Sequence, residues 1–282
     1  MGVLLFSFLC VLVTAIIIVF LFPKKKKTIV KVIFDSNVYR KIGTPETFKK
    51  EPSIKHYKKI RKAIKNGEIE PYISETVFTI EAVQKKNRKQ FLSLENLTER
   101  SEIISESQIK HEIDTGAVVS FENNPILKKH FLDILKIKFK IVRFPRIGGI
   151  INSDLENFRH KMEGNALSEF HTKVFEVGKK IEDAGAGISQ LKKIGFKYDT
   201  SWQKGIKEAP DSEQGEIGKA CAEWADGDSV SICIALGCDY LCTNDNAVGG
   251  GSKSVFSATN LAWLSNQYQL KIISPEDLAN LL

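Results

Sequence analysis

The fold is indicated by residues 28–40, which read TIVKVIFDSNVYR. Residues 29–34 are apolar and mostly β-branched apart from Lys31, as expected of a strand buried in a sheet. The apolar run stops abruptly at Asp35, and Ser36 and Asn37 follow it. This stretch therefore predicts a buried strand that delivers a carboxylate and two further polar side chains to one edge of a sheet.

A later stretch has the same form. Residues 239–250 read DYLCTNDNAVGG, an apolar strand that ends at Thr243, Asn244 and Asp245. Parallel α/β sheets place their sites beyond the carboxyl ends of the strands. If the two strands are neighbours in one parallel sheet, Asp35 and Asp245 should therefore lie close together.

Elements that alternate between strand and helix fill much of the remaining chain. The apolar spacing predicts helices at residues 52–66, 160–183 and 228–236 and strands at 69–74, 139–145 and 270–273. Residues 85–114 are polar and predict a broken helix, and residues 184–205 predict loop and short helix. This alternation is typical of an α/β fold with a central parallel sheet covered on both faces.

The N-terminal residues differ in composition from the rest. Val3 to Phe22 carry no charge, which is the length needed to cross a bilayer as a helix. A cleaved signal peptide is the alternative, but the lysines follow the apolar run, at residues 24–27, and no small-residue cleavage site does. We expect a single-pass transmembrane anchor at residues 1–23 and a basic linker at 24–28. Lysines favour the cytoplasmic side, so the N-terminus should face outward and the remaining chain the cytoplasm.

Charge is unevenly distributed along the chain, whose net charge is +7. Residues 23–90 contain 19 Lys and Arg against 7 Asp and Glu, a net +12, and the rest of the chain carries −5. Such a basic region can face anionic lipid, follow a phosphate backbone or simply be solvated. The cysteines beyond residue 200 sit in or beside apolar stretches, as buried thiols do.

Four acids stand where a parallel sheet could bring them together. Asp35 and Asp245 follow strands, Asp228 opens a predicted helix, and Glu81 lies on the helix after the strand at 69–74. Carboxylates gathered without a lysine or arginine among them repel one another strongly. A divalent cation relieves that repulsion, and hard oxygen ligands select Mg²⁺ or Mn²⁺.

Four fragments in order resemble the PIN domain family of nucleases. They read VIFDSNVYR, PYISETVFTIEAV, DSVSICIALGCDYLCTNDNAV and LKIISPEDL. The resemblance covers residues 29–86 and 221–282. It implies a three-layer α/β/α fold for residues 29–282, interrupted at about 87–219 by an insertion that we expect to be largely helical.

The resemblance also implies roles for particular residues. By its pattern the catalytic and metal-binding acids are Asp35, Glu81, Asp228 and Asp245. Neighbouring polar residues that would support those acids are Ser36, Asn37, Thr243 and Asn244. Glu75 is an alternative to Glu81, and Asp226 and Glu223 are alternatives to Asp228.

The implied activity is that of a membrane-anchored, Mg²⁺- or Mn²⁺-dependent endoribonuclease that hydrolyses phosphodiester bonds with metal-activated water. The expected partners are single-stranded RNA, the membrane through residues 3–22, an antitoxin or other protein, and a second copy of the chain in a homodimer. Two alternatives stay open: a catalytically weak module that binds RNA or a protein at the membrane, and a structure-specific DNA nuclease. We expect Asp35→Asn and Asp245→Asn to behave alike, losing metal affinity without loss of stability.

Overall fold

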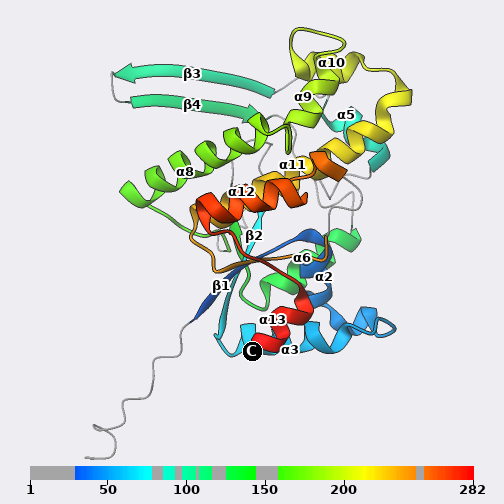
Figure 1. Cartoon of the computed structure of the whole chain (residues 1–282), viewed down its shortest axis with the longest axis vertical. Coiled ribbons are helices and arrows are strands. Elements are labelled where there is room, and N and C mark those ends of the chain that lie inside the picture. The colour runs from blue at the N-terminus through cyan, green and yellow to red at the C-terminus, as the bar shows by residue number, and fades with distance from the viewer. Residues whose placement is uncertain are drawn as a thin grey trace, which may run out of the picture.

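A computed structural model describes residues 29–77, 85–92, 97–105, 108–115, 125–143, 158–245 and 251–282. Its centre is a five-stranded, all-parallel sheet, which confirms the prediction of an α/β fold with a central parallel sheet (Figure 1). The strand order is β5-β2-β1-β6-β7. The strands of this sheet are β1 (Val30–Phe34), β2 (Ile69–Ser74), β5 (Lys140–Val142), β6 (Tyr240–Cys242) and β7 (Ile272–Ile273).

Ten helices and four 3₁₀ turns accompany the sheet in the described part of the chain. The helices are α2 (Ser36–Gly43), α3 (Ile54–Lys65), α5 (Arg88–Leu92), α6 (Pro125–Leu135), α8 (Gly164–Asp183), α9 (Ser189–Gly195), α10 (Trp202–Glu208), α11 (Gln214–Ala235), α12 (Ala258–Tyr268) and α13 (Pro275–Leu281). The 3₁₀ turns are η1 (Pro45–Phe48), η2 (Lys85–Asn87), η4 (Asp211–Glu213) and η5 (Gly251–Lys253).

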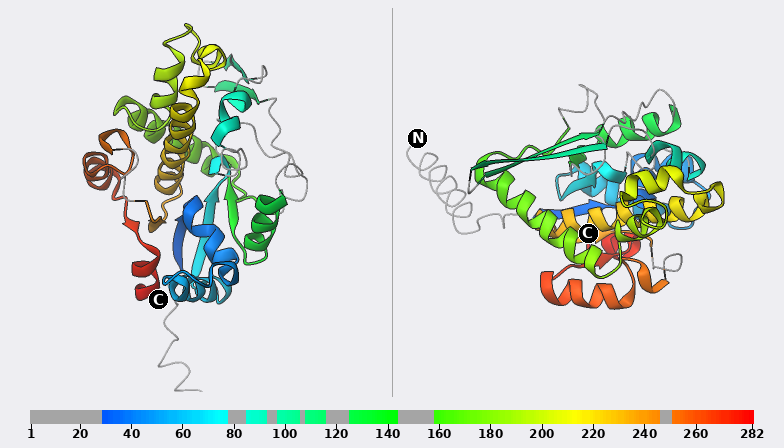
Figure 2. Two further views of the ribbon diagram at one scale, coloured as in Figure 1. Left: turned by 90° about the vertical axis from the view of Figure 1, so that its right-hand side faces the viewer. Right: turned by 90° about the horizontal axis from the view of Figure 1, so that it is seen from above.

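The two faces of the sheet bury two separate cores, because alternate residues of a strand point to opposite faces. Val32 and Phe34 of β1 pack with α2, α3, α6 and α13, whereas Ile33 packs with α8, α11 and α12. In the left view of Figure 2, the orange helix α12 and the green helix α6 lie at opposite margins of the molecule. Burial on both faces explains the nearly continuous apolar sequence of β1.

Helix α11 corrects one prediction of element boundaries. The predicted short helix at 228–236 is the last part of a 22-residue helix that begins at Gln214. The polar Asp226-Gly227-Asp228 sequence suggests a helix start, yet the helix runs through it. Gly227 is present because α11 meets the loop after α8 there: an added Cβ would lie 3.2 Å from the Cα of Gly187.

Helices predominate among the described residues between 87 and 219, but one part of this segment corrects a second prediction. Leu97–Ser105 (β3) and Gln108–Thr115 (β4) form an antiparallel hairpin, where we predicted broken helix. The helices α5, α9 and α10 of this segment pack on the first half of α11 in a third core that includes Trp224. The segment is thus joined to the sheet through α11.

The predicted membrane anchor, Val3 to Phe22, lies outside the described residues. Among the residues that the structure does describe, none of the helices has the length and apolar character that crossing a bilayer requires.

Helices α9 and α10 touch backbone to backbone, and this contact makes a prediction. A Cβ added at Gly205 would lie 1.8 Å from the carbonyl oxygen of Gly195. Gly205→Ala should therefore lower the free energy of unfolding by about 1–3 kcal/mol, the usual cost of overpacking. Gly215→Ala is the matched control, since nothing lies within 4 Å of its added Cβ. Urea unfolding of the two variants checks this, and equal stability would contradict the contact.

Candidate functional site

The site lies where the connectivity of the sheet reverses. In chain order the main strands run outward from β1 to β2 and β5 on one side, and from β6 to β7 on the other. Ligands of parallel α/β sheets bind at this reversal, beyond the carboxyl ends of the two central strands. Here those strands are β1 and β6, and their last residues, Phe34 and Cys242, are paired. Asp35 and Thr243 therefore emerge side by side.

Asp35 is buried and surrounded by donors. Thr243 Oγ1 donates to Asp35 Oδ2 at 2.6 Å, and Asn37 Nδ2 donates to the same oxygen at 2.8 Å. The backbone N–H of Ser36 donates to Oδ1, which makes Asp35 the N-cap of α2. The structure thus brings Asp35 together with three of the four supporting polar residues that the resemblance implies.

The ionised form of the Asp35 carboxyl is disfavoured in this position. Burial raises its pKa above the ordinary 3.8, the hydrogen bonds from Thr243 and Ser36 oppose that rise, and the nearby charge of Asp245 raises the pKa further. Burial and the charge of Asp245 both disfavour the ionised form of Asp35, and a bound cation would offset both effects.

Asn244 and Asp245 are tied to the same cluster through the backbone. The N–H of Asp245 donates to Thr243 Oγ1 at 2.9 Å, and the N–H of Asn244 donates to Asn37 Oδ1 at 3.1 Å. Asn244 Nδ2 also donates to the hydroxyl of Tyr57 at 3.0 Å. These bonds fix the chain after β6 against the start of α2, while the Asp245 side chain stays exposed.

A cavity of about 110 Å³ opens at this edge. Its walls include three carboxylates, from Asp35, Asp245 and Asp226. Its other lining residues are Ser36, Asn37, Val77, Arg88, Ala222 and Ala225. The acid that α11 contributes to the cavity is therefore Asp226, which we had named as an alternative to Asp228.

Asp228 lies outside the acidic cavity. It lies in the middle of α11 rather than at a helix start, and it is 1% exposed. Thr76 Oγ1 donates to Asp228 Oδ2 at 3.1 Å. Residues two apart on a helix do not share a face, so Asp226 and Asp228 diverge, and Asp228 does not line the cavity.

The remaining predicted ligand is Glu81, with Glu75 as the alternative. Glu81 lies outside the described residues. Glu75 is described: it is buried at the end of β2 and forms ion pairs with Arg159 at 3.2 Å and Arg143 at 3.9 Å. Those two arginines account for its charge, and Glu75 does not line the acidic cavity.

Arg88 is the site residue that the sequence did not reveal. We expected no lysine or arginine among the acids, but Arg88 lines the cavity, held by a 2.7 Å hydrogen bond from its Nη1 to the carbonyl of Gly218. Nothing in the basic run around residue 88 distinguishes it from its neighbours. Its guanidinium offsets part of the negative charge and adds a group suited to phosphate.

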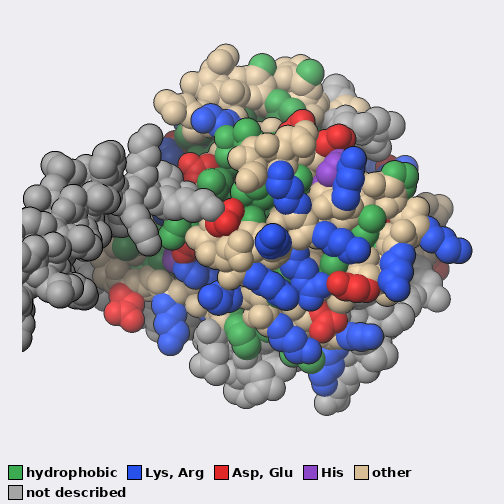
Figure 3. All heavy atoms as spheres, turned by 90° about the horizontal axis from the view of Figure 1, so that it is seen from below, with side chains coloured by type: hydrophobic (Ala, Val, Ile, Leu, Met, Phe, Trp, Pro, Cys, Tyr) green, Lys and Arg blue, Asp and Glu red, His purple; other side chains and the backbone are tan. Residues whose placement is uncertain are grey.

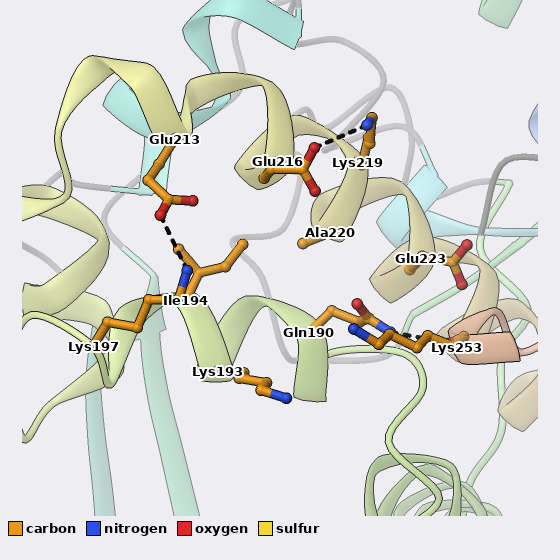
Figure 4. A pocket seen from close by; sticks show the side chains of 10 residues that line it. All are labelled: Gln190, Lys193, Ile194, Lys197, Glu213, Glu216, Lys219, Ala220, Glu223 and Lys253. Carbon is orange, nitrogen blue, oxygen red and sulfur yellow. Dashed lines mark hydrogen bonds and ion pairs between the residues drawn. The ribbon is translucent and has the colours of Figure 1, made fainter. Parts of the chain in front are cut away.

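Glu223 stands one turn before Asp226 on α11 and lines a second cavity, of about 320 Å³, between α9 and α11 (Figure 4). It accepts a hydrogen bond from the N–H of Val255 at 3.3 Å. Burial raises the pKa of Glu223, hydrogen bonds oppose that rise, and the charge of Asp245 raises the pKa further. Glu223 therefore belongs to the surroundings of Asp245 rather than to the acidic cavity itself.

The chemistry of the acids fits a hard divalent cation, because the donors are carboxylate oxygens. In the described part of the chain, however, no group of three or more His, Cys, Asp or Glu is arranged closely enough to hold a metal ion. Asp35, Asp245 and Asp226 share the cavity walls without forming a coordination shell. A complete site would need these acids to move together or a further ligand.

Comparison with known proteins gives no relative: no protein-family model, no curated protein and no solved structure matches the chain.

The Thr76–Asp228 contact gives a prediction about stability. Thr76 is 2% exposed, and Thr76→Val keeps its volume but removes the donor to a buried carboxylate. We expect the free energy of unfolding to fall by about 1 kcal/mol, the net contribution of a typical intramolecular hydrogen bond. Thr200→Val, at an exposed threonine, is the control and should be neutral. Guanidinium unfolding curves that coincide for the two variants would show that the bond contributes nothing.

Proposed function

We propose that the chain is a PIN-like nuclease with a three-layer α/β/α fold, a Mg²⁺- or Mn²⁺-dependent endoribonuclease that acts on single-stranded RNA. The observation that carries the proposal is the meeting of Asp35, Thr243 and Asp245 at the strand reversal between β1 and β6, with Thr243 Oγ1 2.6 Å from the Asp35 carboxylate. The parallel sheet, with Asp35 and Asp245 after its two central strands, supports the proposal.

The residues of the site would have three roles: to hold the cation, to orient a ligand and to bind the substrate phosphate. Asp35, Asp245 and Asp226 would hold the cation, with Glu81 as a further ligand from outside the described residues. Thr243 and Asn37 orient the Asp35 carboxylate through the bonds at 2.6 and 2.8 Å. Arg88 would bind a phosphate oxygen of the substrate at the cavity wall. When bound, the divalent cation supplies activated water and stabilises charge during phosphodiester hydrolysis.

A second candidate is a module that binds RNA at the membrane without cutting it. Two observations favour it: the described acids do not form a three-ligand group, and Arg88 stands among them. An arginine beside two or three acids can hold a phosphate group without metal. The membrane anchor, the antitoxin and the homodimer stay predictions under either function.

The deciding experiment incubates the full chain with mixed single-stranded RNAs in Mg²⁺, Mn²⁺ or EDTA, with duplex DNA in parallel. The nuclease predicts RNA fragments that appear with Mg²⁺ or Mn²⁺ and not with EDTA. Binding that survives EDTA, with no fragments in any metal, would replace the nuclease with the binding module. Cleavage of duplex DNA but not of RNA would replace it with a DNA nuclease.

A further inference from the structure

One surface of the molecule has a large charge that the described residues do not neutralise. Seven exposed lysines lie on the segment from the end of η1 to the end of α3, and we call this surface the basic face. Its lysines are Lys49, Lys50, Lys55, Lys58, Lys59, Lys62 and Lys65. Figure 3, which views the molecule from below, shows a broad area of Lys and Arg side chains.

Two acids near the basic face are already paired with other cations. Glu46 pairs with Arg61 at 3.1 Å, and Glu51 pairs with Lys41 at 2.7 Å. None of the seven lysines forms an ion pair with another residue that the structure describes. Their charges therefore repel one another, and an anionic surface laid against them would relieve that repulsion.

The arrangement of α3 fixes these lysines outward. Tyr57, Ile60, Ala63 and Ile64 bury one side of the helix in the core with β1. Helical periodicity then leaves the five lysines of α3 on the opposite side. Because the core holds the inner side of α3, these five charges are presented together on one side of a packed helix.

The chain reaches the sheet at this same end of the molecule. Val30 pairs with Ile69, and its N–H donates to the carbonyl of Glu68 at 3.0 Å, three residues beyond the last lysine of α3. The sequence just before this point is four consecutive lysines, and before them comes the uncharged run from Val3 to Phe22. In the sequence, only residues 23–29 separate the end of the apolar run from Val30 at the start of β1.

We propose that the basic face lies flat on an anionic lipid surface. The expected partner is a bilayer whose negative headgroups attract clustered lysines within a Debye length. Because all five strands are parallel and β1 starts at this end, their carboxyl ends point away from the lipid (Figure 1). Asp35, Asp226 and Asp245 then open toward the aqueous phase, where negative headgroups do not repel them or a polyanionic substrate.

Nucleic acid is the other polyanion that such a surface could bind. Lipid is favoured because β1, which follows the apolar run and the four lysines in the sequence, starts beside the carboxyl-terminal end of α3. The amino-terminal part of α3 also approaches the carboxyl edge of the sheet, where the Tyr57 hydroxyl accepts a hydrogen bond from Asn244, so the test includes single-stranded RNA. The inference does not depend on nuclease activity, so either proposal can fail without the other.

The test measures lysine reactivity in the full chain. The protein is placed in lipid nanodiscs of phosphatidylcholine alone, or of phosphatidylcholine with a minority of phosphatidylserine, and is briefly acylated. Peptide mass spectrometry then gives the rate at each lysine. We expect the basic face to react severalfold more slowly in the anionic discs. Four exposed lysines elsewhere should react equally in both, namely Lys161, Lys193, Lys204 and Lys253. Salt near 1 M, where the Debye length is about 3 Å, should abolish the difference.

A pair of variants with equal charge change completes the test. Replacing Lys55, Lys58, Lys59 and Lys62 with Gln should remove the anionic-lipid protection of Lys49 and Lys65. The same replacement of the four control lysines should leave that protection intact. Equal rates at the basic face in both kinds of disc, or a chain that does not bind the anionic discs, would overturn the proposal. Protection by single-stranded RNA but not by anionic lipid would assign the face to nucleic acid and overturn it equally.

Discussion

Asp245→Asn should reduce RNA cleavage by at least about 100-fold, since loss of a second-shell partner of a metal ligand already costs about 10–100-fold. The Asp245 side chain is exposed at the mouth of the acidic cavity, and Asn nearly preserves its shape while removing one negative charge. The bond that positions this residue comes from its backbone N–H to Thr243 Oγ1, which the substitution keeps. Metal affinity should fall with activity, while the metal-free free energy of unfolding should stay level.

The control for this variant lies at the other end of the same strand. Asp239 Oδ2 accepts a hydrogen bond from the N–H of Lys31, far from the carboxyl edge of the sheet. Asp239→Asn removes the same charge and should change neither Mn²⁺ affinity nor cleavage. Calorimetric titration of Mn²⁺ into wild type and both variants compares them directly. Equal affinity in all three would mean that residues 243–245 only form a turn, and the nuclease proposal would fail with them.

The central sheet was predictable because its strands are buried on both faces. In β1, the buried residues Val32, Ile33 and Phe34 alternate between the two cores, so the strand is apolar apart from Lys31 and has an abrupt polar end. The abrupt polar ends of β1 and β6 also predicted part of the site, because Asp35 and Thr243 directly follow Phe34 and Cys242, which are paired in the sheet. Two short strand ends contain enough information to place residues that are 208 positions apart in the chain.

The contribution of α11 could not be placed in the same way. Whether Asp226 or Asp228 faces the cavity depends on the helical phase, and the phase depends on where the helix begins. The Gly227 that suggests a break lies where Gly187 approaches α11 closely, a contact between distant segments. Arg88 is a similar case, because it is bonded to the carbonyl of Gly218, 130 residues away.

The hairpin of β3 and β4 escaped prediction for a different reason. Residues 85–114 are mostly polar, and we predicted a broken helix there. Hydrophobic periodicity is the main signal of secondary structure in a sequence, and a polar segment provides little of it.

Asp35→Asn should remove cleavage as Asp245→Asn does, but it should also weaken the fold, which revises the expectation that the two variants behave alike. Asp35 accepts hydrogen bonds on both oxygens, from Ser36 on one and from Asn37 and Thr243 on the other. Asn offers one acceptor oxygen, so its NH₂ group must face a donor on one side. Leaving a buried group unsatisfied costs about 1–3 kcal/mol, which is the expected loss in the free energy of unfolding near neutral pH.

The pH dependence of stability separates this loss from a general defect. The pKa of Asp35 is raised in the folded state by burial, so without metal the folded protein binds a proton more readily than the unfolded chain. The wild type should therefore gain stability as pH falls from the raised pKa toward the ordinary value of 3.8, and lose that gain as pH rises again. Asp35→Asn lacks the titrating group, so its deficit relative to wild type should widen as pH falls.

Adding Mn²⁺ should reverse the sign of the slope of stability against pH in the wild type but not in Asp35→Asn. A cation that binds the folded state stabilises it in proportion to the logarithm of its concentration over the dissociation constant. It also favours the ionised carboxylate, so wild-type stability in Mn²⁺ should rise with pH. Urea unfolding across this pH range, with EDTA or Mn²⁺, tests both slopes, and Asp239→Asn should follow wild type in each. If Asp35→Asn also followed wild type in EDTA, Asp35 would not titrate in the folded protein. If Mn²⁺ left the wild-type slope unchanged, the carboxylate would not be a ligand, and the buried acid at the end of β1 would serve only as the cap of α2.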